Sequence, residues 1–322
     1  RYHLAEVPEM AALASWKLTI GGDAATKETT LTLDDLKAMP AHEITAVCQC
    51  SGNRRGLFSP HVPGVEWGFG AMGCAVWRGP RLKDVLARAG VKDNALEVWM
   101  NGADSAPLPS TPDFIKSLPT AKAMSDETII ALTMNDAPLP WGNGYPARVV
   151  VPGWTATYWM KHVAKIDVMS KPLDSFWMQK AYRVPAGMFA VDHPFPSQDT
   201  AANWPITEMV VNSLIAAPVD GDKATREGLT VEGVAWDRGH GIRGVEVSVD
   251  DGKTWQKATL GKDLGPYAFR TFTFKTGKLA AGRHVLSARA TSNSGETQAE
   301  TLKFNPAGYH HNVPQKVAVT VT

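Results

Sequence analysis

Cysteine, unbalanced charge and long apolar runs are all scarce in this sequence of 322 residues. Three cysteines exclude a disulfide scaffold and leave at least one thiol unpaired within a monomer. Lys and Arg total 33 against 32 for Asp and Glu, so a net charge of +1 offers no basic surface to nucleic acid. No apolar run approaches the roughly 20 residues that a membrane helix needs, so the sequence predicts no membrane partner.

The first residues, Arg1-Tyr2-His3, do not form the charged and then apolar leader of an exported protein. We therefore expect no signal peptide in this chain. A leader already removed would leave the same start, so these residues do not indicate a compartment.

Hydrophobic residues make up 44% of the chain and charged residues 20%, which is ordinary for a globular protein with a sizeable core. Domains average roughly 150 residues, which suggests two of them. The pattern changes near residue 207, from mixed segments rich in Trp and Pro to short alternating strands. We expect an α+β chain with domains at 1–205 and 206–322.

The first half predicts both helices and strands. Thr32 and Asp35 begin a capping box whose helix ends before Pro40. A second helix, opening near Pro80, places Leu82, Val85, Leu86 and Ala89 on one face and ends at Gly90. Strands are predicted at 41–50, 148–151 and 165–169.

The second half predicts an immunoglobulin-like β-sandwich of about seven strands. Alternation of apolar and polar residues marks most of the strands, and Asp251-Gly252 is a hairpin-turn pair. The predicted strands are 229–236, 245–249, 269–274, 284–290, 301–304 and 317–321.

The run from Gly68 to Gly73 matches the dinucleotide fingerprint G-x-G-x-x-G letter for letter. That motif requires a strand before it and a helix starting within it, whereas the residues after Gly73 are typical of a strand. We therefore interpret the run as a tightly packed glycine loop and expect no nucleotide there.

Cys48 and Cys50 fall on the same face of a strand that ends at Cys50. A buried apolar thiol is the default for each cysteine. Cys50, however, precedes Gly52 and the pair Arg54-Arg55, and positive charge favours the thiolate that a soft or high-valent metal requires. A site for a metal and an oxyanion competes here with the alternative that both arginines are solvated surface residues.

Other candidates carry little information by themselves. His310-His311 forms a metal-ligand type of pair, but loop histidines are more often exposed or at an interface. No Cys-x-x-Cys-His motif is present, so the sequence predicts no covalently attached haem in this chain.

From Cys50 to Arg55 the sequence resembles the molybdenum domain of the sulfite oxidase family, in particular the bacterial sulfite dehydrogenases. The resemblance spans nearly the whole chain and keeps its order through both halves. Its strongest pieces are residues 1–4, 50–55, 64–67, 77–82 and 143–153, and, for the family's dimerisation domain, 248–255 and 305–309.

The resemblance implies a role for each matching residue. Cys50 matches the cysteine that binds molybdenum, which the pyranopterin (molybdopterin) also holds. Arg1, His3, Arg55 and Tyr182 match residues of the sulfite pocket, and Asp104, Asn143, Arg148 and Lys161 match positions that bind the pterin and its phosphate. Asn143 stands where vertebrate relatives have histidine, but its amide can still donate a hydrogen bond.

The chemistry agrees with these residue types, because guanidinium groups hold oxyanions through charge-assisted, bidentate hydrogen bonds. The resemblance implies oxidation of sulfite to sulfate by two electrons, with a separate c-type cytochrome as acceptor or partner subunit. It also implies a periplasmic location and a homodimer formed through the C-terminal domain.

Two alternatives stay open. A related molybdenum enzyme could act on nitrate or a sulfoxide, although eukaryotic nitrate reductases carry fused haem and flavin domains and sulfoxide reductases generally lack the C-terminal sandwich. A non-catalytic binding protein of the same fold is the third interpretation, and the presence of Arg1, Cys50, Arg55 and Tyr182 together argues against it.

Overall fold

A computed structural model describes residues 15–106 and 108–322 of the chain, which form two compact units. The described part of the N-terminal unit comprises 15–44, 48–51, 75–106 and 108–208. The C-terminal unit comprises 45–47, 52–74 and 209–322. This division differs from the predicted domains in assigning 45–47 and 52–74 to the unit that contains the C-terminus and 206–208 to the other unit.

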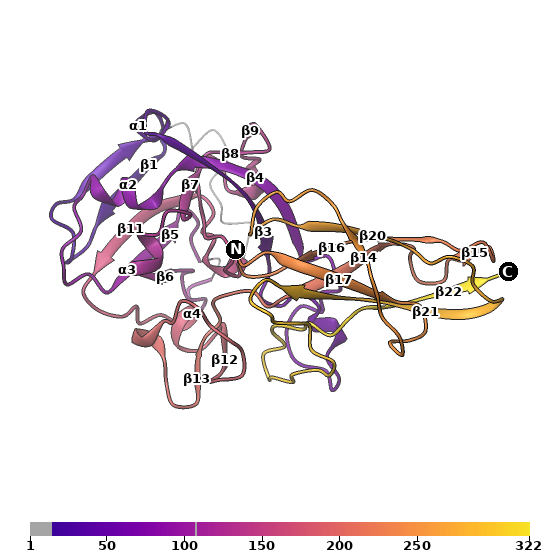
Figure 1. The fold of residues 1–322 in the computed structure, drawn as a ribbon. Helices are drawn as coiled ribbons and strands as arrows, with labels where there is room; N and C mark the ends of the chain where they lie inside the picture. The colour runs from indigo at the N-terminus through magenta and orange to yellow at the C-terminus, as the bar shows by residue number, and fades with distance from the viewer. Residues whose placement is uncertain (1–14, 107) are drawn as a thin grey trace. The chain divides into compact units, whose positions relative to one another are not determined.

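A mixed five-stranded sheet forms the centre of the N-terminal unit (Figure 1). Alternate residues on its strands, such as Leu18, Ile20, Val98 and Met100, are fully buried, as a sheet packed against a core requires. Strands β1 and β11 pair in parallel and the other neighbours pair antiparallel. Its order is β2 (Thr29–Thr32), β1 (Lys17–Gly21), β11 (Val163–Met169), β5 (Glu97–Gly102) and β6 (Lys116–Pro119).

Short helices connect these strands. Thr32 and Asp35 form the predicted capping box, and the helix that follows ends before Pro40 as expected. The predicted apolar face of the second helix is fully buried, and Gly90, with φ of 74°, follows its end. In the described residues the α-helices are α1 (Leu33–Lys37), α2 (Leu82–Ala87), α3 (Thr120–Ala123) and α4 (Phe176–Gln179).

Within 15–208, the described residues form three smaller sheets as well. One has the order β3 (Ala41–Gln49), β4 (Met72–Pro80), β8 (Thr133–Met134) and β9 (Ala137–Pro138). The others pair β7 (Ile129–Ala131) with β10 (Arg148–Val150) and β12 (Arg183–Pro185) with β13 (Asn203–Pro205). Single 3-10 turns lie at Arg55–Leu57, Trp141–Asn143, Ala156–Tyr158 and Pro196–Gln198.

Two sheets form a β-sandwich in the C-terminal unit, as predicted (Figure 1). Their inner faces bury aliphatic residues and Phe272 in one core. One sheet has the order β14 (Asn212–Ala217), β16 (Thr230–Trp236), β20 (Arg270–Lys275) and β19 (Thr259–Leu260). The other has the order β15 (Lys223–Ala224), β22 (Lys316–Val321), β21 (Gly282–Ser292), β17 (Ile242–Ser248) and β18 (Gln256–Lys257).

Two predictions for the sandwich, a turn and a strand, have different outcomes. Asp251 and Gly252 have φ of 60° and 83°, which is the conformation that the hairpin turn requires. The strand predicted at 301–304 is wrong, because these residues form no ladder. Their alternation resembles a strand, but they lead into the loop that Asn305 closes on itself by hydrogen bonds.

The glycine run from Gly68 to Gly73 leads directly into strand β4 and not into a helix, which confirms that it is no dinucleotide motif. The expected tight packing, however, is wrong. A Cβ atom placed on Gly68, Gly70 or Gly73 would meet no heavy atom within 4 Å.

His310 and His311 are buried, so the expectation that they are exposed is wrong. Their exposed fractions are 6% and 9%. Burial lowers the pKa of His310 to about 3, and burial together with the Arg54 charge lowers that of His311 to about 4. Both rings are therefore neutral at pH 7.

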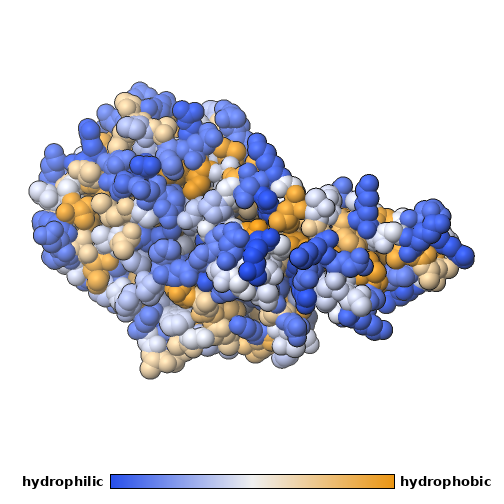
Figure 2. Space-filling view, in the orientation of Figure 1, coloured by the Kyte–Doolittle hydropathy of each residue, from blue (hydrophilic) through white to orange (hydrophobic). Residues whose placement is uncertain are grey.

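Surface properties agree with the composition. In Figure 2, hydrophilic residues cover most of the visible surface of either unit, and hydrophobic residues occur in small separate groups. Among the residues that the structure describes, no helix has the length and apolar character to cross a membrane.

The buried histidines predict a loss of stability in mild acid. Unfolding returns their pKa to about 6.5, so the unfolded chain binds more protons below that pH and stability falls progressively towards about pH 4. We expect the melting temperature of the double variant His310→Gln/His311→Gln to change less between pH 7.5 and pH 4.5 than that of the wild type. The control is His61→Gln, which changes an exposed histidine in the same unit. Equal pH dependence of the melting temperature in all three proteins would show that His310 and His311 do not cause the loss of stability.

Candidate functional site

Cys48 and Cys50 lie at the end of strand β3, where the N-terminal unit gathers positive charge. Cys50 follows the last strand residue and is partly exposed. Burial raises the pKa of the Cys48 thiol, the charge on Arg148 opposes that shift, and Cys50 and Lys161 also act on it. Two thiols and two cations therefore share one location.

Arg148 is the best-defined cation of this group. Its guanidinium lies over the Trp77 and Trp159 rings, 4.9 and 5.6 Å from their centroids. It donates to the carbonyl oxygens of Asn143 (3.0 Å) and Trp159 (3.2 Å), and its Nη2 lies 3.9 Å from the Cys48 sulfur. Burial lowers the pKa of Arg148. Its Nε atom is buried with no hydrogen-bond partner among the described residues.

A glycine loop before β10 packs against both cations. Lys161 Nζ donates to the Gly142 carbonyl at 2.7 Å. Gly144 has φ of 112°, and a Cβ atom there would lie 3.0 Å from Lys161 Cβ and 3.1 Å from Arg148 Cβ. Only glycine fits this position without strain, so the loop fixes the peptide groups beside Asn143.

Asp104 reaches the same region from strand β5. The N–H of its neighbour Ala103 donates to the His162 carbonyl at 2.8 Å, which places Asp104 beside the Lys161-His162 segment. His162 in turn bonds through Nδ1 to the Tyr145 carbonyl at 2.6 Å. The structure therefore brings together five predicted positions, namely Cys50, Asp104, Asn143, Arg148 and Lys161.

This donor set fits an anionic group joined to a metal. The hydrogen bonds of Arg148 go to carbonyl oxygens and a thiol. Among the residues that the structure describes, no carboxylate balances its buried charge. In the described part of the chain no three His, Cys, Asp or Glu side chains form a metal-ligand cluster. A cofactor that brings its own metal ligands and a phosphate, and takes one thiolate from the protein, matches these residues.

Tyr182 belongs to a second cluster in the same unit. Lys116, which is fully buried, lies 5.1 Å from the Tyr182 ring centroid and 4.6 Å from that of Tyr158. Its Nζ donates to the Trp177 carbonyl at 2.8 Å. Burial, reinforced by the charge on Arg183, lowers the pKa of Lys116 well below its ordinary value.

The adjacent arginines lie in the C-terminal unit and differ in exposure. Arg54 is fully buried, donates to the carbonyls of Ser213 (2.5 Å) and Val313 (3.2 Å), and has a pKa lowered to about 9 by burial. Arg55 is half-buried and donates from Nε to the Ala307 carbonyl at 3.0 Å. The solvated-surface alternative is therefore wrong for Arg54.

Two predicted site residues have no described position, and two residues near the site were not predicted. Arg1 and His3 lie outside the described residues. Cys48 and Lys116 were not among the predicted site residues. The predicted shared strand face already placed Cys48 beside Cys50, but it gave Cys48 no role at the site. No local pattern distinguishes Lys116 from a surface lysine.

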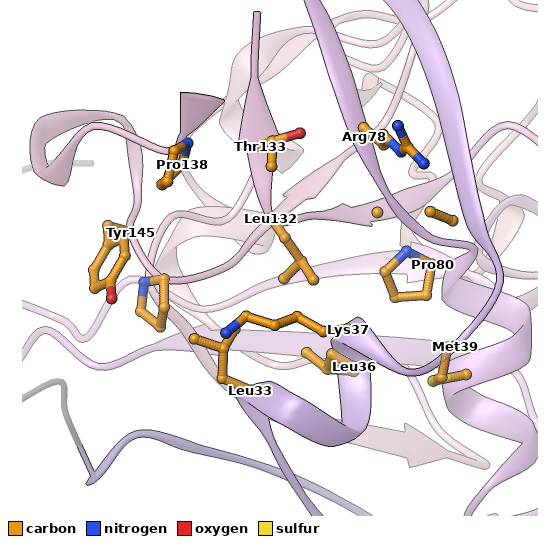
Figure 3. A pocket seen from close by; sticks show the side chains of 13 residues that line it. Leu33, Leu36, Lys37, Met39, Arg78, Pro80, Leu132, Thr133, Pro138 and Tyr145 are labelled. Carbon is orange, nitrogen blue, oxygen red and sulfur yellow. The ribbon is translucent and has the colours of Figure 1, made fainter. Parts of the chain in front are cut away.

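A separate cavity of about 390 Å³ in the N-terminal unit has a mostly hydrocarbon lining (Figure 3). Leu33, Leu36 and Pro80 line it, and Lys37, one of its charged residues, pairs with Asp34 at 3.1 Å. Arg78 also lines it, and none of the five site positions named above is among its lining residues.

Two family descriptions match the sequence. "Oxidoreductase molybdopterin binding domain" covers residues 4–177, and "Mo-co oxidoreductase dimerisation domain" covers residues 203–322. The chain therefore belongs to the molybdopterin-binding oxidoreductases, and within them to the sulfite oxidase family. The cofactor of this family is molybdenum-molybdopterin, and the donor set described above fits it.

Individual relatives agree with this placement. The mitochondrial sulfite oxidases of Mus musculus and Homo sapiens are 34% and 33% identical over 95% and 96% of this chain. The chain spans 58% of the length of each. The nitrate reductase [NADH] of Hordeum vulgare is 30% identical over 96% of the chain and 36% of its own length. The solved sulfane dehydrogenase SoxCD of Paracoccus pantotrophus is similar with a TM-score of 0.80 and 27% identity, over 94% of this chain and 74% of that one.

The glycine loop predicts how the cofactor is retained. Gly144→Ala should lower the molybdenum and pterin content of purified protein severalfold, because its Cβ would displace Lys161 and Arg148. Gly142→Ala, two residues away, meets no heavy atom within 4 Å and serves as the control. Equal cofactor content in the two variants would show that this loop does not hold the cofactor.

Proposed function

We propose that this protein is a sulfite dehydrogenase, which oxidises sulfite to sulfate and passes two electrons to a c-type cytochrome. The observation that carries the proposal is the location shared by Cys48, Cys50, Arg148 and Lys161, which suits one metal–thiolate bond beside an anionic cofactor. The names of the mammalian relatives support sulfite as substrate.

When bound, molybdopterin supplies a two-electron redox centre at molybdenum. The protein contributes binding and orientation: Cys50 offers the thiolate, Arg148 and Lys161 offer positive charge to the phosphate, and Asn143 and Asp104 offer polar contacts to the pterin. The indole rings on Arg148 exclude water from its guanidinium, which strengthens its attraction for an anion.

The substrate residues act on the oxyanion. Arg55, together with Arg1 and His3 in the family pattern, binds sulfite oxygens by charge-assisted hydrogen bonds and sets the direction of the sulfur lone pair. Tyr182 donates a hydrogen bond to an oxygen of the substrate or product. Sulfite gains one oxygen from water, and two protons and two electrons are released.

The electrons leave one at a time to a c-type cytochrome, either a transient acceptor or a partner subunit. The match to a dimerisation domain supports a homodimer formed through the C-terminal unit. A periplasmic location is part of the proposal and follows from the resemblance to bacterial sulfite dehydrogenases.

Related sulfur substrates and nitrate are the competing possibilities, since relatives include a sulfane dehydrogenase and a nitrate reductase. Parallel assays of native-source protein with sulfite, thiosulfate and nitrate, each with cytochrome c or a reduced dye, separate them. A preference for nitrate or for sulfane sulfur would overturn the proposal.

Cys50→Ser should abolish sulfite-dependent reduction of cytochrome c, because a hydroxyl does not replace thiolate as a ligand to this metal. The matched control is Cys74→Ser, whose sulfur accepts the Phe269 N–H at 3.5 Å. The steady-state rate of sulfite-dependent cytochrome c reduction is measured for both variants. Wild-type rates for Cys50→Ser would exclude the cysteine as the metal ligand.

Arg55→Gln should raise the sulfite KM by roughly tenfold or more, because loss of one charge-assisted hydrogen bond costs about 1.5–3 kcal/mol. Circular dichroism and molybdenum content confirm that the variant is folded and loaded. An unchanged KM in loaded protein would place Arg55 outside the substrate site.

A further inference from the structure

Three glycines leave the space that the Arg55 side chain occupies in the C-terminal unit. A Cβ atom on Gly52 would lie 2.5 Å from Arg55 Nη2, one on Gly64 2.9 Å from Nη1, and one on Gly308 2.7 Å from Cγ. Gly64 and Gly308 also have φ of 119° and 64°, where other residues are strained. The backbone at three separate positions is therefore fitted to this one side chain.

Tyr309 covers one face of the guanidinium. Arg55 Cζ lies 5.1 Å from the centroid of the Tyr309 ring, and Tyr309 is only 7% exposed. Arg55 Nε donates to the Ala307 carbonyl at 3.0 Å and Nη1 to the Val65 carbonyl at 3.3 Å. One stacked ring and two carbonyl groups thus fix the orientation of the guanidinium plane.

The loop that presents Tyr309 is itself closed by a buried amide. Asn305 is fully buried, and its side chain donates to the Tyr309 carbonyl at 2.8 Å and accepts from the Tyr309 N–H at 3.0 Å. The Gly308 N–H donates to the Asn305 carbonyl at 3.0 Å. The ring therefore stands on a rigid five-residue loop, residues 305–309, and not on a mobile connection.

Stacking and oxyanion binding use different parts of a guanidinium. The ring occupies the face, whereas the five N–H donors point outward in the plane. The two carbonyl groups use two donors and leave up to three for an anion. Tyr309 can therefore hold Arg55 without competing for the hydrogen bonds that a sulfur oxyanion would accept.

We propose that Tyr309 is a positioning residue for substrate, which holds the Arg55 guanidinium in the orientation that binds the sulfite and sulfate oxygens. The proposal rests on the proposed function in taking Arg55 as a substrate-binding residue. It adds that the loop of residues 305–309, in the dimerisation-domain part of the chain, takes part in substrate affinity.

The test is Tyr309→Leu, which removes the ring, beside Tyr309→Phe, which keeps it. We expect Tyr309→Leu to raise the sulfite KM and the sulfate dissociation constant about two- to tenfold, as loss of a cation–π contact predicts. The kcat of loaded protein should stay within about twofold, since the lost interaction is uniform binding. Tyr309→Phe should restore both constants to near the wild-type values.

Trp255→Leu is the matched control, because a different arginine, Arg289, lies over that ring at 4.3 Å in the same unit. It removes an equivalent contact and should leave both constants unchanged. In an Arg55→Gln background, Tyr309→Leu should add no further loss of sulfate affinity, whereas an independent, additive loss would overturn the proposal.

Calorimetric titration of the holoenzyme with sulfate separates this proposal from the proposed function. If the wild type binds sulfate but does not oxidise sulfite, the proposed function fails while the sulfate constants still test Tyr309. Unchanged sulfate affinity in Tyr309→Leu overturns the positioning role. If Tyr309→Leu does not fold, Gly308→Ala provides the second variant, since its Cβ would displace Arg55, and unchanged sulfate affinity there has the same meaning.

Discussion

The charge of Arg148 is the constraint on which the rest of the candidate site depends. A guanidinium buried over two indole rings, with bonds to two carbonyl oxygens and a thiol, needs an anion to balance it. Lys161 packs against the same glycine loop and adds a second positive charge. The phosphate of molybdopterin has the charge that this arrangement lacks. The family assignment and the electrostatics therefore lead to the same cofactor by independent arguments.

Arg148 and Arg55 lie in different units and have different chemical roles. Arg148 in the N-terminal unit is enclosed by aromatic rings and bonds inward, as suits a group that binds a permanent cofactor. Arg55 in the C-terminal unit is half-buried and retains donors, as suits a group that binds and releases a small anion. Lys116 is buried against Tyr158 and Tyr182, so the cluster around Tyr182 contains a lysine that is shielded from solvent.

The sequence predicted the fold class and the main elements because their signals are local. The capping box at Thr32, the apolar face of α2 and the Asp251-Gly252 turn depend only on neighbouring residues. Burial of His310 and His311 depends on segments distant in the chain, such as the one with Phe58, 5.7 Å from the His311 ring. The strand predicted at 301–304 failed because alternation says nothing about whether a partner strand exists.

The site was predictable to the extent that the family motifs cover it. Cys50, Asn143 and Arg148 lie in such motifs, whereas Lys161 matches a family position outside them, and the structure brings the four together. The contacts of Arg148 with Trp77 and Cys48, the buried Lys116 and the fit of three glycines to Arg55 are three-dimensional, and no spacing in the chain reveals them.

The central claim is that the Cys50 sulfur binds molybdenum. X-ray absorption at the molybdenum edge of native-source holoenzyme, compared with Cys50→Ser loaded in the same host, tests it most directly. The account predicts one fewer sulfur neighbour of the metal in the variant, with the dithiolene sulfurs retained. Identical sulfur coordination in the two proteins, or native protein without molybdenum, would contradict it.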